Sequence, residues 1–378
     1  MADVVTEPGE TPQEKDVAAR GAKGNARAAV VLSLLGRSAL AAATVIAVVL
    51  LVLRIALKDW HHVVIALRAL YTGAFGSPYD FGNTVNKTTP LLLTGLGVAV
   101  AFRAKLWNIG GEGQFLVGAL AASAAGAYGL VKLPGDSLVN VTLAAGFVAG
   151  GIWAAFPALL KIWRNVPEVI STIMLNFLAL NLLSFLVHGP MQQASHAQPA
   201  TEALPPSAQL PIILPHTTMH AGIVVGLVAA LAVGVYLFIT PAGFNLRLVG
   251  ANPAAARFAG ANVSRVTFGV MVLSGALCGL AGSVELSGLV GTVYETYSPG
   301  YGFAAVAVAL LGRLHPGGVI LSAFFFGALA AGAGAMERVG VSPAVSYVIQ
   351  AITLFVLLFF QQVKVFKSRV LRGSRDHD

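Results

Sequence analysis

Six polar side chains interrupt otherwise apolar stretches of the sequence and could hydrogen-bond a polar molecule. Polar groups in such stretches are costly, and they either serve a function or bond neighbouring helices, which is the commoner use. Thr172 and Asn176 are four residues apart, so they share one face of a helix. Both uses are open for the whole set, which comprises Asn108, Glu112, Thr172, Asn176, Ser274 and Glu285.

Other polar and aromatic residues stand at the ends of apolar stretches. Glu112 and Glu168 each open a predicted helix, where the positive end of the helix dipole favours an acid. For both, this helix-end role is at least as well supported as contact with a solute. Tyr294, Tyr297 and Tyr301 cluster beside an apolar stretch and predict an interfacial aromatic belt; stacking on a planar solute is the weaker alternative.

Several kinds of catalytic and metal site are missing from the sequence. A phosphate-binding loop needs a Gly-Lys pair, and the chain has none, so it does not hydrolyse ATP by that route. It also has neither a Gly-x-Ser-x-Gly elbow nor a His-Glu-x-x-His pair. Histidines 188, 196, 216 and 220 share one loop without metal-ligand spacing, so we expect them to be solvated. We therefore predict no catalytic residue, no metal, no cofactor in this chain and no enzymatic activity.

A short capped helix is predicted in the long polar gap between residues 240 and 265. Asn252 can cap the first amides, Pro253 suits the first turn, and Gly260 can adopt the left-handed turn that ends a helix. A helix this short is unstable alone in water, so it must dock on something. The residues that we expect to form or support the docking surface are Gly250, Asn252, Pro253, Ala255, Arg257, Phe258 and Gly260.

The elements that position these residues are predicted to be transmembrane helices. Of the 378 residues, 56% are hydrophobic and 11% charged, and the mean hydropathy is +0.78. Soluble proteins carry about 25% charged residues. Runs of about 20 apolar residues can cross a bilayer. We predict an all-α, polytopic membrane protein with about ten transmembrane helices, near 39–57, 88–107, 112–130, 138–160, 169–187, 221–239, 266–290, 300–313, 316–335 and 343–363; the 300–313 run is short enough to be re-entrant.

Charge sets the orientation of these helices. With the N-terminus in the cytoplasm, 18 of the 24 Lys and Arg residues fall on the cytoplasmic side, as the positive-inside rule requires. Both termini and the capped helix are then cytoplasmic. The net charge of +8 therefore indicates a membrane protein rather than one that binds nucleic acid. We predict a disordered polar segment over 1–37, a transmembrane domain over 38–363 with a long polar loop at 240–265, and a basic tail over 364–378.

Glycine spacing suggests how the helices pack. Three glycine pairs are four residues apart, which lets helix backbones approach closely in lipid: Gly146 and Gly150, Gly222 and Gly226, and Gly275 and Gly279. General packing is the favoured interpretation over a specific dimer contact. Two Gly-interrupted places, at 107–114 and 312–318, are typical of helices broken along a transport pathway.

Three runs together resemble one known family. The residues at 91–122, 167–183 and 300–319 are similar to the permease subunits of ATP-binding cassette importers for nucleosides and simple sugars, which group with ribose and branched-chain amino-acid permeases. The resemblance covers most of residues 88–363. One departure is Pro167, because usual members have Asn directly before the Glu of that run, whereas here Asn165 lies two residues earlier.

The resemblance implies a set of partners and a location. A cytoplasmic ABC ATPase would bind ATP, a second related permease subunit would complete the pore, and an extracytoplasmic solute-binding lipoprotein would deliver a small polar solute. The setting would be the lipid of a bacterial plasma (inner) membrane, with no nucleic acid involved. The matching ATPase-contacting segment is 247–265, in which we expect Arg257 to meet acidic groups and Phe258 to add apolar contact.

The leading hypothesis is therefore import of nucleosides or a related simple sugar by alternating access, driven by a separate ATPase. The alternative is an ion-coupled secondary transporter that works without an ATPase. A secondary transporter usually carries charged residues deep in its helices. Here the deep positions are mostly Asn, Ser, Thr and Gly, which favours external energy. A membrane scaffold without transport is a third possibility.

Overall fold

The computed structural model describes residue 40, residues 43–129 and residues 137–373. These form two compact units, one of residues up to Lys58 together with Ala351 onward, and the other of Asp59–Gln350. The predicted disordered segment 1–37 lies outside the described residues. The described part of the first unit is helical, with an apolar helix at Ala43–Leu57 and most of α13 (Pro343–Gly373).

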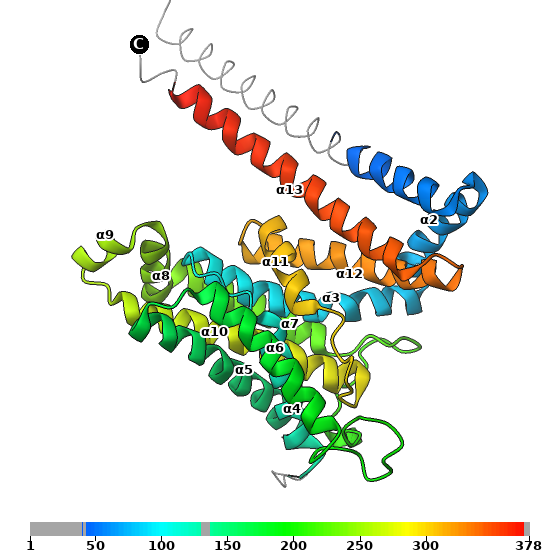
Figure 1. Cartoon of the computed structure of the whole chain (residues 1–378), viewed down its shortest axis with the longest axis horizontal. Helices are drawn as coiled ribbons and strands as arrows, with labels where there is room; N and C mark the ends of the chain where they lie inside the picture. Colours follow the sequence, from blue (N-terminus) through cyan, green and yellow to red (C-terminus); the bar gives the residue numbers. More distant parts are fainter. Residues whose placement is uncertain (1–39, 41–42, 130–136, 374–378) are drawn as a thin grey trace, which may run out of the picture. The chain divides into compact units, whose positions relative to one another are not determined.

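The second unit is built from helices, and a long connection over residues 188–221 that contains only a single 3₁₀ turn joins two of them (Figure 1). Among the described residues, the only β pairing is two isolated bridges, Ala200 with Tyr294 and Ile212 with His220. Its helices are α2 (Trp60–Phe75), α3 (Pro78–Arg103), α4 (Gly111–Gly126), α5 (Ser137–Arg164), α6 (Glu168–Val187), the 3₁₀ turn η1 (Pro206–Ala208), α7 (Gly222–Ile239), α8 (Pro241–Ala251), α9 (Pro253–Phe258), α10 (Val263–Glu285), the π-helical turn η2 (Leu286–Val290), α11 (Tyr301–Leu311), α12 (Pro316–Arg338) and the start of α13.

Six of the described helices are long and apolar enough to cross a membrane: Pro78–Arg103, Leu138–Arg164, Glu168–Val187, Gly222–Ile239, Val263–Val290 and Pro316–Arg338. The runs predicted at 39–57, 300–313 and 343–363 correspond to shorter apolar helices, and α4 has 16 residues. The chain is thus an all-α multi-pass membrane protein. The total of about ten crossings and the sides of the termini stay predictions.

The core of the second unit is α3. In its apolar stretch of 18 residues, 94% of the residues are buried. The helix packs on α10, α11, α12 and α2. Figure 1 shows α3 and α12 running side by side. The helix begins at Pro78, ten residues before the predicted start, because Ser77 caps it: the Ser77 hydroxyl accepts a bond from the amide of Asp80 at 3.1 Å. Lys87, predicted outside the span, therefore lies within α3.

Two of the three predicted glycine pairs lie at the contact between α5 and α10, the most extensive helix contact in the described part of the chain. The third pair, Gly222 and Gly226, faces the side chains of Val284 and Leu92. A Cβ on Gly150 would lie 2.3 Å from the carbonyl oxygen of Gly275, and one on Gly279 would lie 2.2 Å from that of Gly146. The two small-residue pairs thus face each other within one chain, as the general-packing interpretation expects.

Candidate coupling surface and translocation pathway

The capped helix predicted from sequence is present as α9, at one end of the second unit (Figure 1). The Asn252 side chain accepts bonds from the amides of Ala254 and Ala255 at 2.9 and 3.2 Å, and Gly260 has φ +85°. The ring of Phe258 is 95% exposed, although an aromatic side chain normally hides much of its surface. Of α9 itself, only Ala256 is buried. The helix therefore offers an uncovered apolar tip.

The predicted coupling residues divide into a surface and a support. Pro253, Ala255, Arg257 and Phe258 are exposed, whereas Gly250 is buried in α8. A Cβ on Gly250 would lie 2.0 Å from the carbonyl oxygen of Arg103, so α8 is seated directly on the end of α3. This contact gives α9 a mechanical connection to the core helix.

Four of the predicted pathway residues surround the non-helical segment between α3 and α4. The Asn108 side chain donates to Gln114 at 3.0 Å and to Ser274 at 2.8 Å, and accepts from the amide of Gly110. Asn176 accepts from the amide of Gly113 at 2.8 Å and donates to the carbonyl of Ile109 at 2.9 Å. The amides of both Asn residues are thus already bonded within the protein. Their role is to hold a broken helix, which is the structural one of the two uses predicted.

Thr172 belongs to the same neighbourhood but bonds its own helix. Its hydroxyl donates to the carbonyl of Glu168 at 2.7 Å. It is fully buried, and a Cβ on Gly110 would lie 3.0 Å from the Thr172 Cβ. Thr172 therefore packs beneath the non-helical segment without offering a free hydroxyl.

Glu112 joins the first turns of two short helices. Its carboxylate, on α4, accepts a 2.8 Å bond from the amide of Gly302, on α11. Gly302 packs so closely that a Cβ there would lie 2.1 Å from the amide nitrogen of Glu112. One buried carboxylate thus serves the positive ends of both helices. Glu112 therefore lies at a helix end, as predicted. Its carboxylate also bonds the first turn of a second helix, α11, which the sequence did not indicate.

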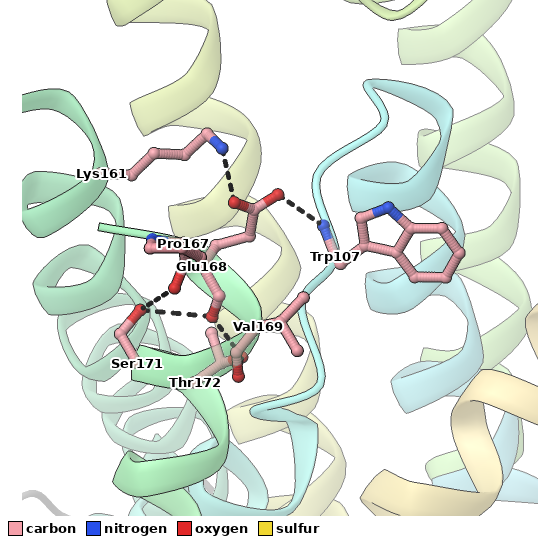
Figure 2. Close-up of polar contacts among 7 residues, drawn as sticks. All are labelled: Trp107, Lys161, Pro167, Glu168, Val169, Ser171 and Thr172. Atoms are coloured by element: carbon pink, nitrogen blue, oxygen red, sulfur yellow. Dashed lines mark hydrogen bonds and ion pairs between the residues drawn. The ribbon is translucent and has the colours of Figure 1, made fainter. Parts of the chain in front are cut away.

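Glu168 ties the start of α6 to two other elements, as Figure 2 shows. Its carboxylate accepts from the Lys161 ammonium of α5 at 2.5 Å and from the backbone amide of Trp107 at 3.2 Å. The Glu168 side chain is 8% exposed and that of Lys161 is 30% exposed. The pair therefore anchors the non-helical segment where α5 and α6 meet.

Glu285 lies apart from these groups, in a buried chain of polar atoms. Its Oε1 accepts from the Tyr301 hydroxyl at 3.4 Å, and the Lys87 ammonium donates to the same hydroxyl at 3.3 Å. Its Oε2 has no hydrogen-bond partner within the described part of the chain. Three helices, α3, α10 and α11, supply the three side chains.

Two expectations about side-chain environment were wrong in part. Tyr294 is 38% exposed, but Tyr297 and Tyr301 are 3% and 4% exposed and pack on Phe115, so these two are core residues and not part of an interfacial belt. His188, His196 and His216 are exposed as expected, but His220 is fully buried. Its Nδ1 accepts from the amide of Gly222 at 3.1 Å, and burial lowers its pKa from 6.5 to about 4.

The sequence interpretation did not identify Lys87, Gln114 or Lys161 as contributors. Lys87 could have been found from the sequence. A helix cap at Ser77 extends α3 to include residues 78–87, and this places Lys87 inside the helix. The other two depend on contacts between helices that spacing alone does not reveal. Over residues 43–129 and 137–373, no group of three or more His, Cys, Asp or Glu side chains could hold a metal ion.

Comparison with known proteins places the chain among transport proteins. A family model described as the permease component of branched-chain amino acid transport systems matches residues 81–358. A guanosine ABC transporter permease of Bacillus subtilis is 39% identical, over 76% of this chain and 84% of its own. A glucose ABC transporter permease of Haloferax volcanii is 34% identical over 83% and 85%, and a nucleoside ABC transporter permease of Lactococcus lactis is 30% identical over 81% and 86%. No solved structure matches significantly.

Proposed function

This chain belongs to the branched-chain amino acid transport system permease family, and we propose that it imports nucleosides or a related simple sugar. As a permease component it is a membrane transport subunit and not an enzyme, and ATP is bound by a partner ATPase. The solute class is supported by relatives that carry guanosine, nucleoside and glucose in their names.

The proposed assembly has three partners besides lipid. A cytoplasmic ABC ATPase supplies energy, a second related permease completes the pore, and an extracytoplasmic solute-binding lipoprotein delivers the solute. Paired relatives support the second permease, because Bacillus subtilis and Lactococcus lactis each have two matching permeases. We propose about ten crossings of a bacterial inner membrane with both termini cytoplasmic, which the distribution of Lys and Arg supports.

The observation that carries the coupling role is the uncovered tip of α9. A nearly fully exposed phenylalanine beside an exposed arginine is typical of an interface anchor, because aromatic and arginine residues dominate binding energy. An exposed ion pair alone is worth about 0–1 kcal/mol, so Arg257 needs the apolar contact of Phe258. Closure of the ATPase dimer would push α9, and α8 would pass this movement to α3 through Gly250.

The proposal predicts that α9 variants uncouple the importer. The complete complex is reconstituted with wild-type chain, Phe258→Ala or Arg257→Ala, and ATP hydrolysis stimulated by guanosine or glucose is measured. Loss of an anchor residue costs about 2 kcal/mol or more, so we expect at least a ~10-fold fall for Phe258→Ala and a smaller fall for Arg257→Ala.

Phe244→Ala is the matched control, because Phe244 is an exposed phenylalanine on the adjoining α8. We expect it to keep the stimulated rate. Wild-type stimulation and uptake in the Phe258 variant would overturn the assignment of α9. Uptake by the purified chain alone, driven by an ion gradient, would instead establish the secondary transporter.

A further inference from the structure

A cavity of about 260 Å³ lies beside Lys87 and Tyr301, within the second unit. Its walls come from α3, α11, α12 and the first two turns of α13. Polar side chains from different helices converge on it, namely Lys87, Tyr301, Glu337, Ser346, Tyr347 and Gln350. The size is close to the lower end of the ~300–1,000 Å³ range of ligand pockets.

Two buried polar atoms at this place lack partners. The Ser346 hydroxyl, on a residue 3% exposed, lines the cavity and makes no hydrogen bond to the described chain. The Oε2 atom of Glu285, which bonds the Tyr301 hydroxyl through its other oxygen but does not itself line the cavity, is likewise unpartnered. Buried polar groups are normally bonded, so the unmet Ser346 hydroxyl on the wall favours a polar occupant of the cavity.

The amide cluster around Asn108 differs in this respect. Asn108, Gln114 and Ser274 satisfy one another, so that cluster has little to offer a solute. By contrast, the cavity is lined partly by polar side chains that can donate or accept hydrogen bonds and partly by apolar side chains, which include Leu91 and Phe326. An apolar wall with a few convergent polar groups is the usual composition of a small-molecule site.

The cavity has no excess of positive charge. The Lys87 ammonium faces two carboxylates: Glu337 on the wall, and Glu285, which it reaches through the Tyr301 hydroxyl. The two carboxylates disfavour an anionic solute, and the Lys87 ammonium disfavours a cationic one. Hydroxyl groups both donate and accept, so they suit an ammonium, a carboxylate and a free hydroxyl together.

We propose that this cavity is a binding site for a neutral, polyhydroxylated solute, with Lys87 and Tyr301 on one wall and Ser346 and Gln350 on another. The proposal rests on the proposed import function and names where the solute binds within the chain. A sugar or the ribose of a nucleoside has the required hydroxyl groups. Tyr301 would orient the solute while staying bonded to Lys87 and Glu285.

Cysteine protection tests the location. Cys278 is the chain's single cysteine, so a Cys278→Ala background allows one reporter thiol. Ser346→Cys and Gln350→Cys are each made there, and the alkylation rate is measured in the reconstituted importer with and without guanosine or glucose. We expect the solute that the importer transports, guanosine or glucose, to slow labelling about 5-fold or more in both variants. The control is Ala197→Cys, at an exposed position in the loop of residues 188–220, and its labelling rate should not change.

Uptake kinetics test the chemistry. Tyr301→Phe removes only the hydroxyl, and Lys87→Met removes the ammonium while keeping most of the chain length. We expect both to lower the uptake rate about 10-fold at saturating lipoprotein. Lys105→Met, an exposed lysine away from the cavity, is the matched control.

The outcomes separate the site from the function. If the wild-type complex imports solute but neither cysteine is protected, and both wall variants import at the wild-type rate, the cavity assignment is overturned and the import function stands. If the wild-type complex imports neither guanosine nor glucose on ATP hydrolysis, the proposed function itself fails. Protection of both cysteines together with slowed uptake supports the site.

Discussion

At the scale of single residues, His220 shows how burial alone changes chemistry. The amide of Gly222 bonds its Nδ1, the side chain of Asn86 accepts a bond from its backbone amide, and a Cβ on Gly288 would lie 2.4 Å from Nδ1. The proton of the neutral ring therefore sits on Nε2, which has no partner in the described structure. Protonation of Nδ1 would break the bond to Gly222.

This predicts a pH dependence of stability. The folded pKa of about 4 is below the ordinary histidine pKa of 6.5, so the unfolded chain binds more protons between those values. The stabilisation from neutral His220 is full above pH 6.5 and is lost as the pH falls toward 4. From pH 7.5 to 5 the loss from this group is about 2 kcal/mol, at 1.36 kcal/mol per unit.

Thermal unfolding of the purified chain at the two pH values measures the effect. His220→Asn removes the titration while keeping an acceptor near the Gly222 amide, so we expect a smaller fall in Tm on acidification. His188→Asn, at an exposed position, should leave the fall as in the wild type. An equal fall in both variants would contradict the role given to His220.

Individual environments were the least predictable part of the site. Asn108 and Asn176 were singled out because an amide in an apolar run must bond something, and in the structure both bond other segments of the chain. Whether that partner is a solute or a helix depends on distances between segments far apart in sequence. The same holds for Tyr301, whose hydroxyl bonds a lysine and a glutamate from two other helices.

At the scale of elements, the contact between α4 and α11 is decided by one glycine. Replacing Gly302 with alanine would put a Cβ 2.1 Å from the amide of Glu112, where backbone has to move. We expect Gly302→Ala to reduce the free energy of unfolding by about 1–3 kcal/mol, as overpacking does. Denaturation of the purified chain, followed by circular dichroism, measures it.

Gly269→Ala is the control for that change. Gly269 lies inside α10 with no atom near the Cβ position, so alanine should be neutral or stabilising by up to ~1 kcal/mol. If the two variants unfold together, the close approach of α4 and α11 does not limit stability.

The sequence predicted a helix and its bounds well where capping residues could be recognised at both ends. Asn252, Pro253 and Gly260 define α9 in the structure as they do in the sequence. Hydropathy alone misplaced the start of α3, because residues 78–87 do not form an apolar run, although Gly82, Thr84, Val85 and Asn86 among them are buried. Helix α2, too amphiphilic to appear as an apolar run, was not predicted at all.

At the scale of the whole molecule, composition predicted the class, and charge predicts the orientation. The proposed topology puts the C-terminus in the cytoplasm and the loop of residues 188–220 outside. We expect a C-terminal green fluorescent protein fusion to fluoresce. In cells carrying Cys278→Ala, we expect a membrane-impermeant thiol reagent to label Ala197→Cys from outside.

Lys105→Cys supplies the opposite case. It lies at the inner end of α3 and should react with the impermeant reagent only after permeabilisation. Labelling of Lys105→Cys in intact cells, or a dark fusion, would invert the topology. Neither the crossing number nor the side of each terminus follows from packing, because the surrounding bilayer is what distinguishes the two faces.

The exposure of Phe258 also concerns the life of the chain before assembly. An apolar ring held in water on a short helix is the kind of feature that proteolytic quality control recognises in unassembled subunits. Docking on the ATPase would conceal it, so the same side chain that transmits force would report completed assembly. The cellular half-life of the chain should then depend on the supply of its ATPase, and Phe258→Ser should weaken that dependence.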